Sequence, residues 1–217
     1  MRLLTFLTVV WAIATMPASA RDLDANFLIK REGKVIGFHQ VQVRETEEGT
    51  VVETEIEMRV KLGPIPLFKY DHDAREVWQG GEVVSIESKT NYNGDKTSVF
   101  AEREDGVLQI DGSNYQGPAP AGAVPSSYWD KGLVAADSLI NTQNGEIIDV
   151  TIQPLGETYA PHNVKAEEYR VSGTMDLNIW YDGQRWVGSH FVVDGEELTY
   201  ELVADEQQYA ALEDYLD

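Results

Sequence analysis

The side chains with the widest chemical range in this sequence are its four histidines, His39, His72, His162 and His190. All but His162 fall in segments with β-strand character. Imidazole titrates near neutral pH and is the commonest metal ligand in proteins, so three rings on one face of a sheet could form a metal or acid/base cluster. The alternative is three separately hydrogen-bonded histidines, because no short ligand spacing connects them.

The direction of each histidine follows from the alternation of side chains along a strand. His72 shares a face with Phe68, Tyr70, Ala74 and Trp78, whereas Lys69, Asp71, Asp73 and Arg75 lie on the other face. His72 is therefore expected to point inward, away from the two flanking carboxylates, and no metal site is predicted there. His39 shares a face with Val41 and Val43, and His190 with Trp186 and Val192, but both strands are apolar on either face. Their direction stays open.

The sequence lacks the usual motifs for nucleophilic catalysis, phosphate binding and zinc hydrolysis, including Gly-x-Ser-x-Gly, Ser-x-x-Lys and His-Glu-x-x-His. No catalytic residue, metal or cofactor is predicted. An enzyme is the least favoured function, and it would depend on the three histidines as acid/base groups.

Aromatic residues suggest a binding function instead. The strands and loops contain Trp78, Trp129, Trp180, Trp186, Tyr70, Tyr92, Tyr115, Tyr128 and Tyr181. Most should be core, since aromatics are enriched in strands, and the remainder could line a pocket. The candidate ligand-binding residues are His39, His72, His190, Tyr70, Trp78 and Trp186.

These side chains must be positioned by β-strands. Val52 to Leu62 alternates apolar residues with Glu, Arg and Lys, and similar alternation occurs at 175–181 and 197–202. Such patterns are typical of antiparallel sheets with one wet face. Turn-forming pairs separate the strands: Glu32-Gly33, Gly80-Gly81, Asn93-Gly94, Asp105-Gly106, Asp111-Gly112, Asn144-Gly145, Asp182-Gly183 and Asp194-Gly195. They predict a meander of roughly ten to twelve strands.

Two segments interrupt the meander. Residues 117–145 contain a Pro/Gly/Ala stretch and a possible short helix capped by Ser127, with Asp130 reaching back. The segment Leu62 to Phe68 contains two prolines, so it is expected to leave the ladder and form a lip. A second short helix is predicted from Asp205 to Leu216. The fold class is mainly all-β: a curved antiparallel sheet closing into a half-barrel or barrel, with one or two short helices.

The first residues predict export. Arg2 precedes the apolar run Leu3 to Ala14, Pro17 ends it, and Ala18-Ser19-Ala20 suits a signal peptidase. We expect cleavage after Ala20 and a single β domain over residues 21–217, located in the periplasm or secreted. The alternative is a buried N-terminal helix or a membrane anchor. Because the chain has no cysteine, lipoprotein acylation, disulfides and thiolate chemistry are excluded.

The charge excludes a class of partners. The chain has 17 basic and 37 acidic residues, and removing Arg2 with the signal leaves 16 against 37, or −21. Nucleic-acid binding depends on cationic side chains that displace counterions, so a nucleic-acid partner is not expected. Anionic membrane surfaces are disfavoured for the same reason.

Several segments together resemble a known family. They are Phe27 to His39, Tyr70-Asp71-His72, Arg75 to Trp78, Val84 to Ser88, Tyr128-Trp129 and Leu177 to Gly188. As a set they are similar to exported bacterial proteins of domain-of-unknown-function family 6134. More distantly, the resemblance implies a curved antiparallel sheet or half-barrel like those of periplasmic lipoprotein carriers. It implies no activity.

Three functions remain open. The first is a periplasmic module that binds or carries an apolar or lipidic molecule. The second is an envelope structural or protein-interaction domain with a fully packed core and no ligand. The third is an enzyme that uses the histidines.

Overall fold

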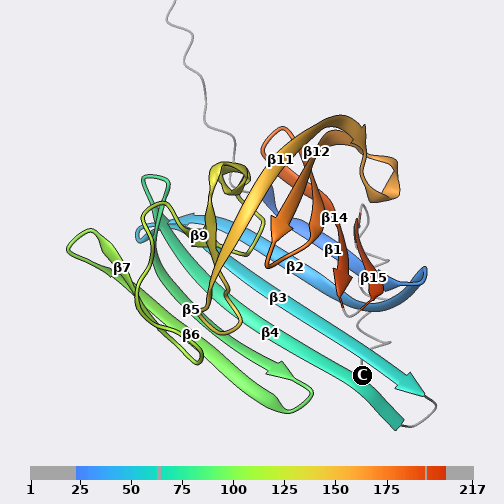
Figure 1. Cartoon of the computed structure of the whole chain (residues 1–217), viewed down its shortest axis with the longest axis horizontal. Coiled ribbons are helices and arrows are strands. Elements are labelled where there is room, and N and C mark those ends of the chain that lie inside the picture. The colour runs from blue at the N-terminus through green and yellow to red at the C-terminus, as the bar shows by residue number, and fades with distance from the viewer. Residues whose placement is uncertain (1–22, 63–64, 194, 204–217) are drawn as a thin grey trace, which may run out of the picture.

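The computed structural model describes residues 23–62, 65–193 and 195–203 (Figure 1). Fifteen β-strands and two 3-10 helices occur in these ranges. The strands are β1 (Ala25–Arg31), β2 (Lys34–Thr46), β3 (Gly49–Leu62), β4 (Ile65–Gln79), β5 (Glu82–Tyr92), β6 (Asp95–Glu104), β7 (Val107–Gly112), β8 (Gln116–Pro118), β9 (Val124–Pro125), β10 (Ser138–Ile140), β11 (Ile147–Tyr159), β12 (Lys165–Gly173), β13 (Leu177–Asp182), β14 (Arg185–Val193) and β15 (Glu196–Leu202). The helices are η2 (Lys131–Ala135) and η3 (Pro161–Asn163).

All fifteen strands form one sheet with β1 at its centre. On one side β1 to β8 pair in chain order, and on the other β1 pairs with β15, followed by β14 back to β9. Phe27 in β1 lies opposite both His39 in β2 and Leu202 in β15, so the first and last strands pair at the centre of the sheet. Every pairing is antiparallel except that of β9 with β10.

The sheet curves but is not closed by strand pairing, because the outermost strands β8 and β9 do not bond to each other. Instead, the turn after β10 bonds across the interior to β5 and β6. The Ser88 hydroxyl donates to the Thr142 carbonyl at 2.5 Å, and the Thr97 hydroxyl donates to the Gln143 carbonyl at 2.6 Å. This confirms the predicted curved antiparallel sheet in its half-barrel form. Figure 1 shows β9 and its flanking loops between the two wings of the sheet.

The core lies on the inner face. Its largest fully buried side chains include Trp186, Tyr181, Phe27 and Ile29. The acidic and basic residues that alternate with them stay outside, where they form ion pairs such as Arg59 with Asp71. One face of the sheet is apolar and the other is charged. Shifting the pairing of two strands by one residue would expose apolar side chains and bury charged ones, so the strand register is strongly specified.

Two details differ from the sequence prediction. The strand count is higher, because the Pro/Gly/Ala stretch contributes the short strands β8 and β9. Asp130, not Ser127, caps the short helix: its side chain accepts from the Gly132 amide of η2. The second predicted helix, residues 205–216, lies outside the described residues, as does the predicted signal peptide.

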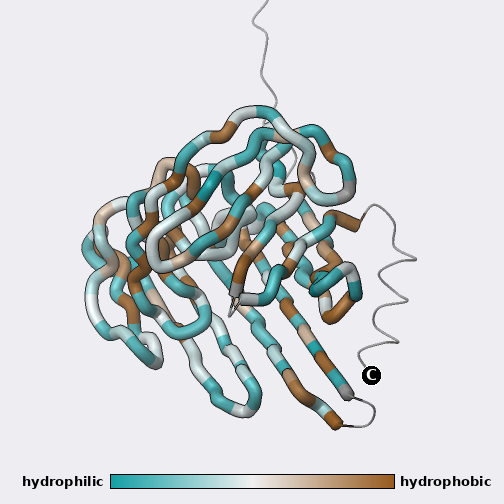
Figure 2. The backbone as a smooth tube through the Cα atoms, turned by 45° about the vertical axis from the view of Figure 1, so that its right-hand side comes forward, coloured by the Kyte–Doolittle hydropathy of each residue, from teal (hydrophilic) through white to brown (hydrophobic). Residues whose placement is uncertain are grey.

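The proline-containing segment also behaves differently from the prediction, which was wrong here. Pairing of β3 with β4 continues as far as Leu62 opposite Ile65, with Lys61 opposite Pro66 after a register shift between Val60 and Lys61. A proline can occupy such an irregular position because a bulge leaves some amides unpaired. The start of β4 is apolar, as the brown end of its tube in Figure 2 shows, and Ile65 and Leu67 are exposed there.

Most predicted turns join strands as expected, but Asp111-Gly112 does not. Gly112 ends β7, and a Cβ atom on it would lie 2.5 Å from the Asn144 carbonyl oxygen and 2.7 Å from the Gly145 Cα. Glycine is therefore needed at this position for the close approach of the turn after β10, which closes the half-barrel, and not for a hairpin.

Candidate ligand-binding pocket

The inner face carries a row of side chains in direct register. His39 in β2 lies opposite Ile56 in β3, which lies opposite His72 in β4, which lies opposite Thr90 in β5. The two histidines are thus two strand spacings apart, roughly 10 Å between backbones. Both are buried, with exposed fractions of 2% for His39 and 3% for His72.

A pocket of about 530 Å³ opens over this row. Its floor is the inner face of β2 to β4, and its opposite wall comes from β14, β15 and residues 126–128, 141–143, 146 and 148. Most of its lining is apolar or aromatic: Ile36, Ile56, Met58, Val60, Phe68, Tyr70, Tyr92, Tyr128, Ile148, Met175, Phe191, Leu198 and Tyr200. This size and lining are typical of small-molecule sites.

His39 is packed among aromatic rings. Its ring centroid is 5.0 Å from that of Trp186, 5.7 Å from Tyr200 and 6.2 Å from Phe27. Neither ring nitrogen has a hydrogen-bond partner within the described part of the chain. Burial, with a smaller contribution from His72, lowers the pKa of His39 from 6.5 to about 3, so the ring is neutral at physiological pH.

His72 lies in the same row on the inner face, but both of its ring nitrogens have hydrogen-bond partners. Its Nδ1 lies 2.8 Å from the Thr90 hydroxyl, and its Nε2 lies 3.4 Å from the Thr142 hydroxyl. Burial lowers the pKa of His72 to about 4. This histidine therefore ties the turn after β10 to β4 and β5 in its neutral form.

Three buried tyrosines, Tyr70, Tyr128 and Tyr200, supply further polar atoms to the pocket wall. Burial raises the pKa of each phenol above its ordinary value, so all three stay protonated. Their aromatic neighbours fix the rings: Tyr200 packs on Phe191 at 5.0 Å and Tyr128 on Trp186 at 5.5 Å. The pocket thus combines apolar walls with neutral hydrogen-bonding groups.

Of the six candidate residues, His39, His72 and Tyr70 line the pocket. Trp186 lies behind His39 in the core, and Trp78 packs against Trp129 with ring centroids 5.3 Å apart. His190 does not join the other histidines, which corrects the proposed three-histidine cluster. In the described residues no group of three His, Cys, Asp or Glu side chains could hold a metal ion.

A β-bulge explains the position of His190. Trp180 pairs with Gly188 and Tyr181 pairs with Trp186, which leaves Val187 as an extra residue in β14. An extra residue reverses the alternation beyond it. Trp186 therefore points into the core, whereas His190, four residues later, lies on the outer face near Glu197, with its Nε2 3.9 Å from that carboxylate.

Sequence reasoning missed Glu76. Its carboxylate is buried on the inner face at the end of β4, where one oxygen accepts from the indole nitrogens of Trp78 at 2.8 Å and Trp129 at 3.3 Å. Burial raises its pKa. Glu76 does not line the pocket but joins β4 to the segment that forms the opposite wall. Its parity with His72 and Trp78 was the available signal.

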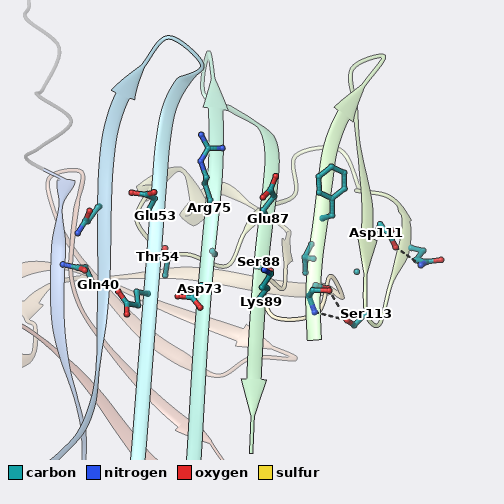
Figure 3. A pocket seen from close by; sticks show the side chains of 18 residues that line it. Gln40, Glu53, Thr54, Asp73, Arg75, Glu87, Ser88, Lys89, Asp111 and Ser113 are labelled. Atoms are coloured by element: carbon teal, nitrogen blue, oxygen red, sulfur yellow. Dashed lines mark hydrogen bonds between the residues drawn. The ribbon is translucent and has the colours of Figure 1, made fainter. Parts of the chain in front are cut away.

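A second and larger hollow, of about 950 Å³, lies on the outer face of β2 to β7 (Figure 3). Its side chains are mostly polar and charged, and many bond to one another or to neighbours. Arg75 pairs with Glu48 at 2.7 Å, and Gln116 donates to Asp111 at 2.7 Å. With many of its polar groups engaged and no apolar wall, this shallow surface is a poorer candidate than the inner pocket.

Comparisons with known proteins agree with this architecture. A family model described as "Domain of unknown function (DUF6134)" matches residues 27–203. The crystal structure of a β-barrel-like protein of domain of unknown function DUF1849 from Brucella abortus is similar, with a TM-score of 0.57 and 11% sequence identity. The match covers 83% of this chain and 94% of that chain, and it shows a shared fold. No curated protein matches the chain.

Proposed function

The chain belongs to the DUF6134 family, whose description names no activity, and we propose that it binds an apolar or lipidic small molecule in the inner pocket. The observation that carries the proposal is a pocket of about 530 Å³ with a mainly apolar lining. A fully packed structural domain would have no reason to keep such a volume open, because interiors normally pack with few voids larger than a water molecule.

The location of the pocket supports reversible binding. It lies between the β2–β4 floor and a wall that includes residues 126–128 and 141–143, where the Thr142 carbonyl accepts from the Ser88 hydroxyl. Near its rim, Phe68 packs against Tyr92 with ring centroids 5.5 Å apart, and both side chains line the pocket. An apolar ligand would enter beside these residues.

We further propose that the protein does this work outside the cytoplasm, after cleavage behind Ala20. The support is the signal-peptide pattern of the sequence. None of the helices within residues 23–203 that the structure describes is long and apolar enough to cross a membrane. N-terminal sequencing of the exported protein should begin at Arg21, and a product that retains the first residues would contradict this.

Binding is tested with delipidated protein and the fluorescent apolar probe N-phenyl-1-naphthylamine. We expect saturable fluorescence enhancement in the wild type. Ile56→Trp should abolish it, because Ile56 is on the pocket floor between the two histidines. Val192→Trp, at an exposed position, is the matched control and should bind normally. A wild type without saturable binding, or an Ile56→Trp variant that binds as tightly, would refute the proposal.

A further inference from the structure

His39, at the back of the pocket, has hydrogen-bonding groups that the fold does not satisfy. Both its nitrogens are buried without a partner in the described part of the chain. Such groups are rare in native proteins because each loses its hydrogen bonds to water. His72 shows that this sheet can satisfy a histidine in the same row, since Thr90 and Thr142 meet its two nitrogens. The lack of partners at His39 therefore points to a polar group supplied from outside.

Neutral tyrosine hydroxyls in the same pocket could hydrogen-bond to the polar group that His39 lacks. Tyr200 contacts the His39 ring, and Tyr70 and Tyr128 line the same pocket. Tyr70 and Tyr128 accept side-chain hydrogen bonds through their backbone carbonyls, from Arg59 and Tyr181. No bond to any of the three phenol oxygens occurs among the described residues. A phenol can both donate and accept, so these oxygens suit an uncharged oxygen atom.

Of the charged groups in the lining, Arg31 and Glu196 pair with each other and Glu146 is exposed to solvent. Arg31 donates to Glu196 through two nitrogens, at 2.8 Å and 3.0 Å. Glu146 accepts from Asn144 at 3.0 Å. A carboxylate or ammonium at the level of His39 would thus be buried without a free counter-charge, which is costly in an apolar site.

We propose that the pocket selects apolar molecules with one uncharged, oxygen-bearing end, such as a long-chain alcohol or ester, and that this end lies against His39 and the tyrosine hydroxyls. The inference rests on the proposed binding function and specifies its ligand class. At about 30 Å³ for each non-hydrogen atom, the volume of water in the liquid, a pocket of about 530 Å³ holds roughly 18 such atoms.

Competition against N-phenyl-1-naphthylamine tests this. Three ligands of equal chain length are compared: dodecanol, dodecanoate and dodecylammonium, at a pH where the last two are charged. We expect dodecanol to displace the probe from the wild type at a concentration at least about ten-fold lower than either ion requires, since burying an unpaired charge is unfavourable. Dodecanoate or dodecylammonium that competes as well as dodecanol would overturn the proposed ligand class.

Two variants locate the polar contact. His39→Leu and Tyr200→Phe should each weaken dodecanol about five-fold more than they weaken the probe, as expected for the loss of one neutral hydrogen bond to the alcohol. The matched control is His190→Leu on the outer face, which should change neither. Unchanged dodecanol affinity in both variants would overturn the role of His39 and Tyr200. Failure of the wild type to bind even the probe would instead refute the proposed function itself.

Discussion

Acid sensitivity of the fold is a direct consequence of the two buried histidines. Both are neutral in the folded protein, with pKa values lowered by burial from 6.5 to about 3 for His39 and about 4 for His72. In the unfolded chain each takes up a proton below its ordinary pKa. The two histidines therefore leave the free energy of unfolding undiminished above pH 6.5 and lower it as the pH falls from there toward their pKa values in the folded protein.

The magnitude follows from the number of protons that each state binds. Between pH 7.5 and pH 5, an unfolded histidine of pKa 6.5 becomes almost fully protonated, while His39 and His72 stay almost entirely neutral in the folded state. Each shift of one pKa unit is worth about 1.4 kcal/mol, so each histidine lowers the free energy of unfolding by about 2 kcal/mol over this range. Together they remove about 4 kcal/mol, a large part of a typical total of about 5–15 kcal/mol.

Urea unfolding followed by tryptophan fluorescence measures this at both pH values. His39→Leu should halve the acid-dependent loss, from about 4 to about 2 kcal/mol, because one titrating group is gone. It should also be at least as stable as wild type at pH 7.5 without ligand, since it removes two buried unpartnered nitrogens. His190→Leu is the control, because His190 is partly exposed on the outer face. An acid-dependent loss in His39→Leu equal to that of wild type would refute the reasoning.

Two further predictions concern a buried carboxylate and a glycine at a close approach between strands. Glu76→Ala leaves the indole N–H groups of Trp78 and Trp129 without their acceptor and should cost about 1–3 kcal/mol for each, measured by urea unfolding, whereas Glu76→Gln keeps an acceptor and should lose much less. Because burial raises the pKa of Glu76, its contribution to stability falls as pH rises through the folded pKa, and the Gln variant should lack this dependence. Gly37→Ala places a Cβ 1.9 Å from the Glu57 carbonyl oxygen and should lower the unfolding free energy by about 3 kcal/mol or more; a thermal midpoint equal to wild type would contradict this.

The alternation of side chains along a single strand was enough to predict which residues of β4 face the pocket. In β4, charged residues on one side and aromatic residues on the other were enough to place Tyr70 and His72 on the inner face, where both are buried. For β14 the same rule failed, because the bulge at Val187 reverses the alternation. A bulge depends on pairing with the neighbouring strand, so the residues of β14 alone do not reveal it. Alternation alone predicts that His190 shares a face with Trp186, whereas the structure places His190 on the outer face.

The opposite wall of the pocket was beyond local patterns for a different reason. Thr142 and Gln143 meet Ser88, Thr90 and Thr97 through contacts separated by about fifty residues of sequence. These contacts form only because β11 to β15 return to pair with β1 at the centre of the sheet. Local sequence indicated that residues 117–145 interrupt the meander, but not which strands the segment would cover.

The different environments of His39 and His72 give the strongest argument that the pocket is functional. Selection for stability alone would favour an apolar residue at position 39, because an apolar side chain of similar volume would remove two buried unpartnered nitrogens. Cores usually satisfy such groups, as the sheet does at His72. Residues that reduce stability are characteristic of binding sites, where a ligand completes what the fold leaves unsatisfied. A ligand that bonds to His39 should therefore raise the thermal midpoint of wild type more than that of His39→Leu, and equal shifts would show that the histidine is not part of the site.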